Sequence, residues 1–165
     1  LSLEVNKNTL IPRPDTEALV DNSIEKIRTW QKKHPGSQCL IGELGTGTAA
    51  IPLAICSELM NLYIVAVDCA ADALEVAGRN LKHHENLLSP KNNRIELIES
   101  NLFSKLNNPA KFDFIISNPP YIPSGNITNL QVNGTPDSRI SQQHTFLNFN
   151  NIHFRRYELF QSNQI

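Results

Sequence analysis

The tetrapeptide Asn118-Pro119-Pro120-Tyr121 follows an apolar run that begins at Phe112. Its prolines fix φ, so the Asn118 side-chain oxygen and the Pro119 carbonyl can be held as a pair of hydrogen-bond acceptors. Such a pair can bind both N–H bonds of a planar amine or amide and favour attack of its nitrogen on a methyl group. Tyr121 can lie flat against that group and stabilise developing positive charge. The alternative is an ordinary strand-ending turn, because Asn and Pro are common turn residues.

A glycine-rich turn in the stretch GELGTGTAAIPLA places Glu43, Gly45 and Gly47 between a predicted strand and a predicted helix. Glycines there permit positive φ, and the helix N-terminus offers unpaired N–H groups to a ligand. Asp68 ends the next predicted strand, where doubly wound folds place an acid that binds ribose hydroxyls. Each feature also has a structural interpretation, as a tight turn or a helix cap. Together they predict a nucleoside-bearing cofactor, without distinguishing NAD from S-adenosylmethionine, and the tetrapeptide favours the second.

The elements that must position these residues alternate along the chain. The sequence predicts strands over 39–41, 62–68, 94–100 and 112–118. Helices are predicted between them, over 49–60 and 71–85, after a first helix that Asp15 caps and Pro35-Gly36 ends. This alternation is typical of an α/β fold with a doubly wound, mostly parallel sheet, whose ligands bind beyond the carboxyl ends of the strands.

The composition of the 165 residues excludes several classes of protein. Formal net charge is −1 and the pI is about 6.6, so no global field attracts nucleic acid. No apolar stretch approaches the roughly 20 residues that a membrane-spanning helix needs. The three cysteines form no C-x-x-C pair, which argues against a zinc site or a disulfide framework. We therefore expect one domain with no metal, no membrane contact and no direct nucleic-acid partner.

Taken together, these residues resemble the HemK/PrmC family of S-adenosylmethionine-dependent methyltransferases, which modify the glutamine of the Gly-Gly-Gln motif in peptide-chain release factors. The matching stretches lie between Leu10 and Pro123: IPRPDTEALV, ELGTGTAAIPLA, AVDCAADALEVAGRN and FDFIISNPPYIP. The NPPY tetrad is shared with enzymes that methylate adenine N6 or cytosine N4, whereas IPRPDTE is more discriminating. The resemblance implies a class I, Rossmann-like methyltransferase fold, a release-factor substrate, and a cytoplasmic or mitochondrial location.

The resemblance also implies residue roles. The cofactor would be bound by Glu43, Gly45, Thr46, Gly47, Asp68, Asn101 and Asn118, with Asp68 on its ribose. The substrate amide would be bound by Asn118, Pro119, Pro120, Tyr121 and Arg13, of which Asn118, Pro119 and Tyr121 would be catalytic. Pro12, Arg13 and Thr16 match a segment that closes over the site.

The chain departs from the family pattern at several places. Ala49 stands where the family usually has glycine, and Asn101 where it has an aspartate that binds the adenine amino group. Few residues precede the first predicted helix, so we expect these 165 residues to lack the family's usual N-terminal helical domain. We expect a methyltransferase domain over 1–123, truncated after the fourth strand, and an atypical polar tail over 124–165. Two alternatives stay open: an amino methyltransferase of nucleic acids, and an inactive relative that at most binds cofactor or a partner.

Overall fold

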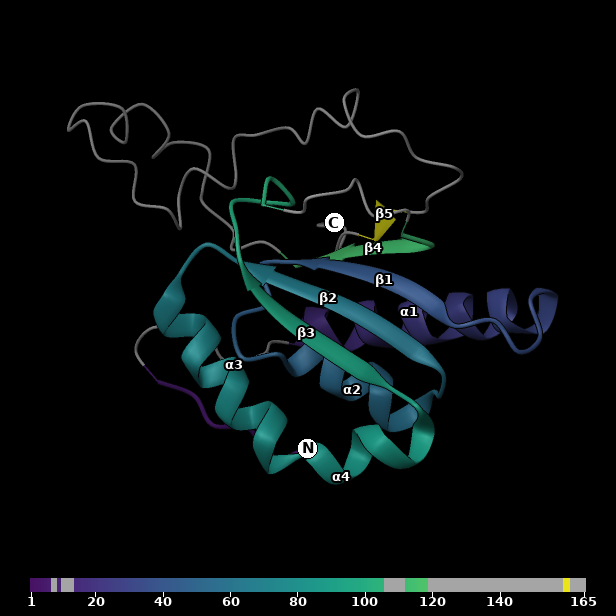
Figure 1. The fold of residues 1–165 in the computed structure, drawn as a ribbon, viewed down its shortest axis with the longest axis horizontal. Coiled ribbons are helices and arrows are strands. Elements are labelled where there is room, and N and C mark those ends of the chain that lie inside the picture. The colour runs from purple at the N-terminus through teal and green to yellow at the C-terminus, as the bar shows by residue number, and fades with distance from the viewer. Residues whose placement is uncertain (7–8, 10–13, 106–111, 119–158, 161–165) are drawn as a thin grey trace.

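Five parallel strands form one sheet in the order β3-β2-β1-β4-β5, shown in the computed structural model of Figure 1. Their bounds are β1 Cys39–Leu44, β2 Leu62–Asp68, β3 Arg94–Glu99, β4 Phe114–Ser117 and β5 Leu159–Phe160. The structure describes residues 1–6, 9, 14–105, 112–118 and 159–160. The strand order reverses between β1 and β4, as in doubly wound sheets, so that position is the topological switch point.

Three helices cover one face of this sheet (Figure 1). They are α1 Pro14–Lys33, α2 Ala50–Glu58 and α3 Ala71–His83, and the short α4 Glu85–Leu88 and the 3₁₀ turn η1 Ser89–Lys91 follow α3. Alternate strand residues such as Cys39, Ile41 and Ile64 point to this face and pack against Ile27 and Ile55 of the helices. Burial of these apolar side chains is the main stabilising contribution to the layer.

The other face of the sheet carries a second apolar cluster. Leu44, Val67 and Ile115 are buried there beside Phe112, whose ring lies 4.8 Å from that of Phe103. Gly42 lies directly beneath these two rings, because a Cβ built on it would be 2.7 Å from Phe103 Cζ. The glycine in the middle of β1 therefore makes room for an aromatic cover.

The predicted order of strands and helices is confirmed, with several differences at their ends. β1 runs three residues beyond the predicted strand, because pairing with both β2 and β4 continues through Gly42 and Glu43. The first helix begins at Pro14, so Asp15 lies inside its first turn and is not the cap. Pro52 is the third residue of α2, where its missing N–H is tolerated.

The structure adds a strand to the four that the sequence predicts. Leu159 and Phe160 pair in parallel with Ile115 and Ile116, so β5 occupies the outer edge of β4. The rest of the predicted polar tail, 124–158 and 161–165, lies outside the described residues. Within the described part of the chain, no helix is both long and apolar enough to cross a membrane.

Candidate active site

The carboxyl ends of three neighbouring strands bring the predicted site residues to one edge of the sheet. Leu44, the last residue of β1, is in register with Val67 of β2 and with Ser117 of β4. The residues that follow these positions are Gly45, Asp68 and Asn118. Residues far apart in the sequence thus meet at the switch point, where ligands bind in sheets of this kind.

The glycine loop between β1 and α2 is held by backbone hydrogen bonds. Gly45 and Thr46 both donate their N–H groups to the Val67 carbonyl, with N···O distances of 2.9 and 3.1 Å. Gly45 and Gly47 have φ of 73° and 55°, in the left-handed region that glycine enters at little cost. Apart from Gly47 and its two chain neighbours, no atom of the described residues lies within 4 Å of a Cβ built on Gly47, so a ligand can approach this backbone closely.

The Asp68 carboxylate connects this loop to the start of α3. Its Oδ2 accepts a hydrogen bond from the Gly47 N–H at 2.9 Å, and its Oδ1 accepts one from the Ala70 N–H at 3.0 Å. The N-cap of α3 is Ala70, whose own side chain makes no capping bond, so Asp68 is not the N-cap residue. The carboxylate instead orders two backbone segments around the predicted ribose position.

Glu43 is a buried carboxylate beneath the loop, with 1% of its surface exposed. Thr46 Oγ1 donates to its Oε2 at 2.6 Å. Among the described residues, its Oε1 is the one buried side-chain oxygen or nitrogen without a hydrogen-bond partner. Burial raises the Glu43 pKa to about 8; Asp68 adds to the rise, and the Thr46 hydrogen bond opposes it.

The unpartnered Oε1 of Glu43 shows whether the residues of this loop could bind the predicted cofactor. A buried carboxylate oxygen without a partner is costly, and an N–H donor from a ligand would satisfy it. The amino group in the methionine part of S-adenosylmethionine is such a donor, and Asp68 lies where a ribose would be held. Glu43, the glycine loop and Asp68 therefore fit this cofactor.

Ala49 has a backbone conformation that glycine adopts more easily than alanine. It is the N-cap of α2, with φ 61° and ψ 26°, and it is completely buried. The left-handed region costs a non-glycine residue roughly 1–2 kcal/mol. The alanine methyl recovers part of that cost by packing with Leu53 and Ala77.

Asn118 is the part of the NPPY tetrad that the structure describes. Its Nδ2 donates to Thr16 Oγ1 in the first turn of α1 at 2.9 Å. The preceding Ser117 donates its hydroxyl to the Leu44 carbonyl at 3.1 Å, which fastens the end of β4 to β1. Asn118 is therefore held from two sides at the switch point.

The remaining predicted site residues are one described residue and five others. Asn101 is exposed in the turn after β3, and its contact with adenine stays a prediction. Outside the described residues lie Pro12, Arg13, Pro119, Pro120 and Tyr121.

Asn80 is a site-supporting residue that the sequence analysis did not single out. It is 1% exposed on α3 and its Nδ2 donates to the carbonyls of Thr48 and Glu4, at 2.9 and 3.0 Å. The Glu4 N–H donates back to its Oδ1 at 2.7 Å. The sequence does indicate that Asn80 is buried, because it continues the buried stripe formed by Ala73, Val76 and Ala77 at helical spacing.

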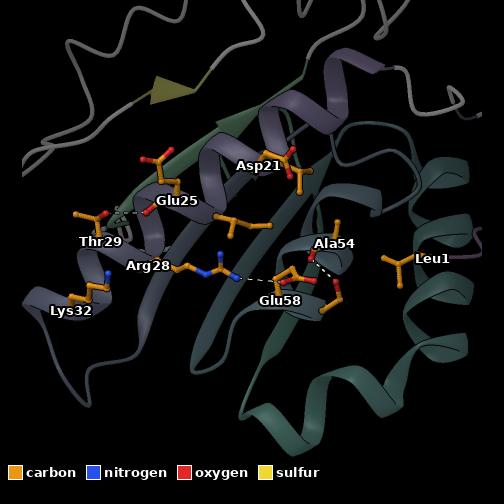
Figure 2. A pocket seen from close by; sticks show the side chains of 11 residues that line it. Leu1, Asp21, Glu25, Arg28, Thr29, Lys32, Ala54 and Glu58 are labelled. Atoms are coloured by element: carbon orange, nitrogen blue, oxygen red, sulfur yellow. Dashed lines mark hydrogen bonds and ion pairs between the residues drawn. The ribbon is translucent and has the colours of Figure 1, made fainter.

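A groove between α1 and α2 lies elsewhere (Figure 2). Its walls include Asp21, Glu25 and Arg28 of α1, and Arg28 contacts Glu58 of α2 at 3.3 Å. Glu58 is the last residue of α2, whereas the glycine loop leads into the first. The groove is thus separate from the carboxyl ends of the strands.

Comparison with known proteins supports the sequence motifs. The model of the methyltransferase small domain family matches residues 27–133. The release factor glutamine methyltransferase of Pasteurella multocida is 41% identical over 131 residues, covering 74% of this chain and 42% of that protein. The enzyme of the same name from Escherichia coli is 44% identical over 122 residues, covering 74% and 39%. The chain thus spans about two fifths of the length of these curated relatives.

A solved structure shows the same fold. The N-terminal domain of human METTL16, in complex with SAH, aligns with a TM-score of 0.56 at 21% identity, covering 98% of this chain and 60% of that one. The resemblance predicted from the motifs is confirmed by the sequence relatives. Since the family model also matches more than half of its residues, the chain belongs to the methyltransferase small domain family.

Proposed function

We propose that this chain transfers a methyl group from S-adenosylmethionine to the side-chain amide nitrogen of the glutamine in the Gly-Gly-Gln motif of a peptide-chain release factor. Two relatives at 41% and 44% identity carry the name release factor glutamine methyltransferase. The observation that carries the proposal is the position of Asn118 directly beside the glycine loop, fixed by the register of Leu44 with Ser117.

The cofactor proposal is supported by the chemistry of the loop. Glu43 offers an unpartnered acceptor, Gly47 a backbone open to close approach, and Asp68 a carboxylate where a ribose would lie. The METTL16 domain, which shares this fold, was solved with SAH. We propose that Glu43, Gly45, Thr46, Gly47, Asp68 and Asn101 bind S-adenosylmethionine.

The substrate amide is proposed to bind between Asn118 and Pro119. S-adenosylmethionine supplies an activated methyl group, which the amide nitrogen takes up as the C–S bond breaks and a nitrogen-bound proton leaves to water. Acceptors at Asn118 and Pro119 hold the two N–H bonds and favour the change of the planar nitrogen toward a tetrahedral one. Tyr121 stacks on the amide, and Arg13 binds the substrate peptide.

A methyl-transfer assay tests this function. The full chain is incubated with labelled S-adenosylmethionine and a release factor, and the labelled residue is identified by mass spectrometry. We expect label on the Gly-Gly-Gln glutamine and none on a release factor whose glutamine is replaced by glutamate. Labelling of RNA or DNA in place of the release factor would favour the nucleic-acid alternative. Cofactor binding with no acceptor labelled would favour the inactive relative.

The proposed location and organisation follow from this substrate. A release factor acts where ribosomes are, so we propose the bacterial cytoplasm or a mitochondrion. We also propose that residues 1–123 form the methyltransferase unit and that 124–165 are an atypical polar tail, of which Leu159 and Phe160 pair with β4 of its sheet.

A further inference from the structure

One hydrogen bond joins the start of the first helix to the end of the fourth strand. Asn118 Nδ2 donates to Thr16 Oγ1 at 2.9 Å, across 102 residues of sequence. Thr16 is 7% exposed, so the bond is largely shielded from water. This contact bears directly on the orientation of the proposed catalytic amide.

The position of Thr16 is fixed by the packing of its helix. It lies in the first turn of α1, a helix of 20 residues whose Leu19 and Ile27 are buried against the sheet. Phe114 and Ile116 of β4 belong to the same core cluster. The shared core therefore fixes the distance between α1 and β4. Thr16 and Asn118 are thus held within hydrogen-bonding distance of each other.

We propose that Thr16 is a positioning residue that sets the orientation of the Asn118 side-chain amide. The inference rests on the proposed function for its effect on turnover. The torsion that turns a side-chain amide is broad and roughly two-fold, so an unrestrained Asn118 could present either its oxygen or its nitrogen to the substrate. In the structure Nδ2 lies on the Thr16 side and the oxygen on the opposite side of the amide, and the bond resists rotation of the amide out of this arrangement.

The orientation matters because the substrate group is itself a donor. A substrate NH₂ binds to the Asn118 oxygen and is repelled by the Asn118 NH₂. Loss of the orienting bond removes an acceptor from the reacting nitrogen while the glycine loop and Asp68 keep their own contacts. The expected effect is on turnover, with cofactor affinity retained.

The first test observes the amide directly and needs no activity. The full chain is labelled with ¹⁵N-asparagine, and the Asn118 side-chain NH₂ signals are assigned by their loss in Asn118→Ser. In wild type we expect the hydrogen-bonded proton of this group to be shifted from the position typical of exposed asparagine side chains and to exchange slowly with water. Thr16→Val, which keeps the shape but loses the hydroxyl, should move the signals toward the exposed position and accelerate their exchange, whereas Thr16→Ser should restore them. Unchanged Asn118 signals in Thr16→Val would overturn the proposal.

The second test separates a positioning role from a structural one. In the release-factor assay we expect Thr16→Val to lower kcat about 10- to 100-fold while the dissociation constant for S-adenosylmethionine changes less than about twofold. Thr16→Ser should recover most of kcat. Thr29→Val is the matched control, since the Thr29 hydroxyl on the same helix donates to the Glu25 carbonyl and lines the separate groove of Figure 2.

The outcomes keep the two proposals apart. Equal losses of kcat and cofactor affinity in Thr16→Val would mean a structural role and contradict positioning. If wild type binds S-adenosylmethionine but labels no release factor, the proposed function fails, and the amide signals still decide whether Thr16 orients Asn118.

Discussion

The backbone N–H of Gly47 and the Oδ2 of Asp68 lie 2.9 Å apart and form a hydrogen bond between the glycine loop and the end of β2. The same carboxylate accepts the Ala70 N–H through Oδ1. One side chain thus orders two segments that border the proposed cofactor site. Asp68 therefore has a structural role in addition to the cofactor-binding role that we propose for it.

Replacing Asp68 by asparagine tests whether this side chain supports cofactor binding. The new side chain keeps one oxygen for the Ala70 N–H, but its NH₂ cannot accept from Gly47 or from ribose hydroxyls. We expect the affinity for S-adenosylmethionine, measured by isothermal titration, to fall about tenfold or more, equivalent to roughly 1–2 kcal/mol. Asp72→Asn, an exposed acid in the first turn of α3, should retain wild-type affinity. Equal affinity in the two variants would show that Asp68 does not contact the cofactor.

Asn118→Ala should act mainly on turnover. It removes an acceptor that the proposed mechanism places on the attacking nitrogen, so kcat should fall about 100-fold or more while cofactor affinity changes little. Single-turnover methylation of a release factor gives kcat, and titration gives the affinity. Parallel loss of both quantities would instead assign Asn118 to cofactor binding.

Glu43 should make stability depend on pH. Its pKa is about 8 in the folded chain against an ordinary 4.5, so the folded state holds a proton that the unfolded state releases. This contribution is fully present below pH 4.5 and is lost as pH rises through about 8. Between pH 6 and pH 9, wild type should therefore lose roughly 1–3 kcal/mol of unfolding free energy relative to Glu43→Gln. Glu17→Gln, an exposed change on α1, should follow wild type, and a Glu43→Gln curve parallel to wild type would contradict the assignment.

Gly42 and Gly78 form a matched pair for a packing test. A Cβ on Gly42 would meet Phe103 at 2.7 Å and Phe112 at 3.0 Å, whereas one on Gly78 meets Leu97 at 3.9 Å. We expect Gly42→Ala to cost about 1–3 kcal/mol in chemical denaturation. Gly78→Ala, inside α3, should be neutral or gain up to about 1 kcal/mol from helix propensity. Similar stabilities of the two variants would mean that the Phe103 and Phe112 rings can move away from a Cβ at position 42 at little cost in free energy.

Asn80→Ala tests the link between the N-terminal segment and the loop. The change leaves the buried Thr48 carbonyl without its donor, and we expect a cost of about 2–3 kcal/mol with weaker cofactor binding. Arg79→Ala is the neighbouring control, because its ion pair with Glu4 is solvent-exposed and should leave stability close to wild type. Wild-type stability in Asn80→Ala would refute the supporting role.

The order of chemical groups along the chain could be predicted without coordinates. The glycine turn, the acid at Asp68 and the NPPY tetrad each depend on local residue types, and strand and helix periods are local patterns as well. The end of β1 was underestimated because Gly42 and Glu43 interrupt the apolar run, while pairing on both sides continues the strand through them. The short β5 escaped prediction because two residues carry no period, and only the neighbouring β4 makes them a strand.

Local sequence thus specified the alternating elements and the residues at their ends, since periodicity and turn chemistry act over a few residues. Tertiary structure alone decided which ends meet. The Thr16 contact with Asn118, the burial of Glu43 and the bond from Asn80 to Thr48 all depend on strand order and on which helix covers which strands. Those relationships join residues tens of positions apart, and they arise from packing of the whole sheet and not from any local pattern.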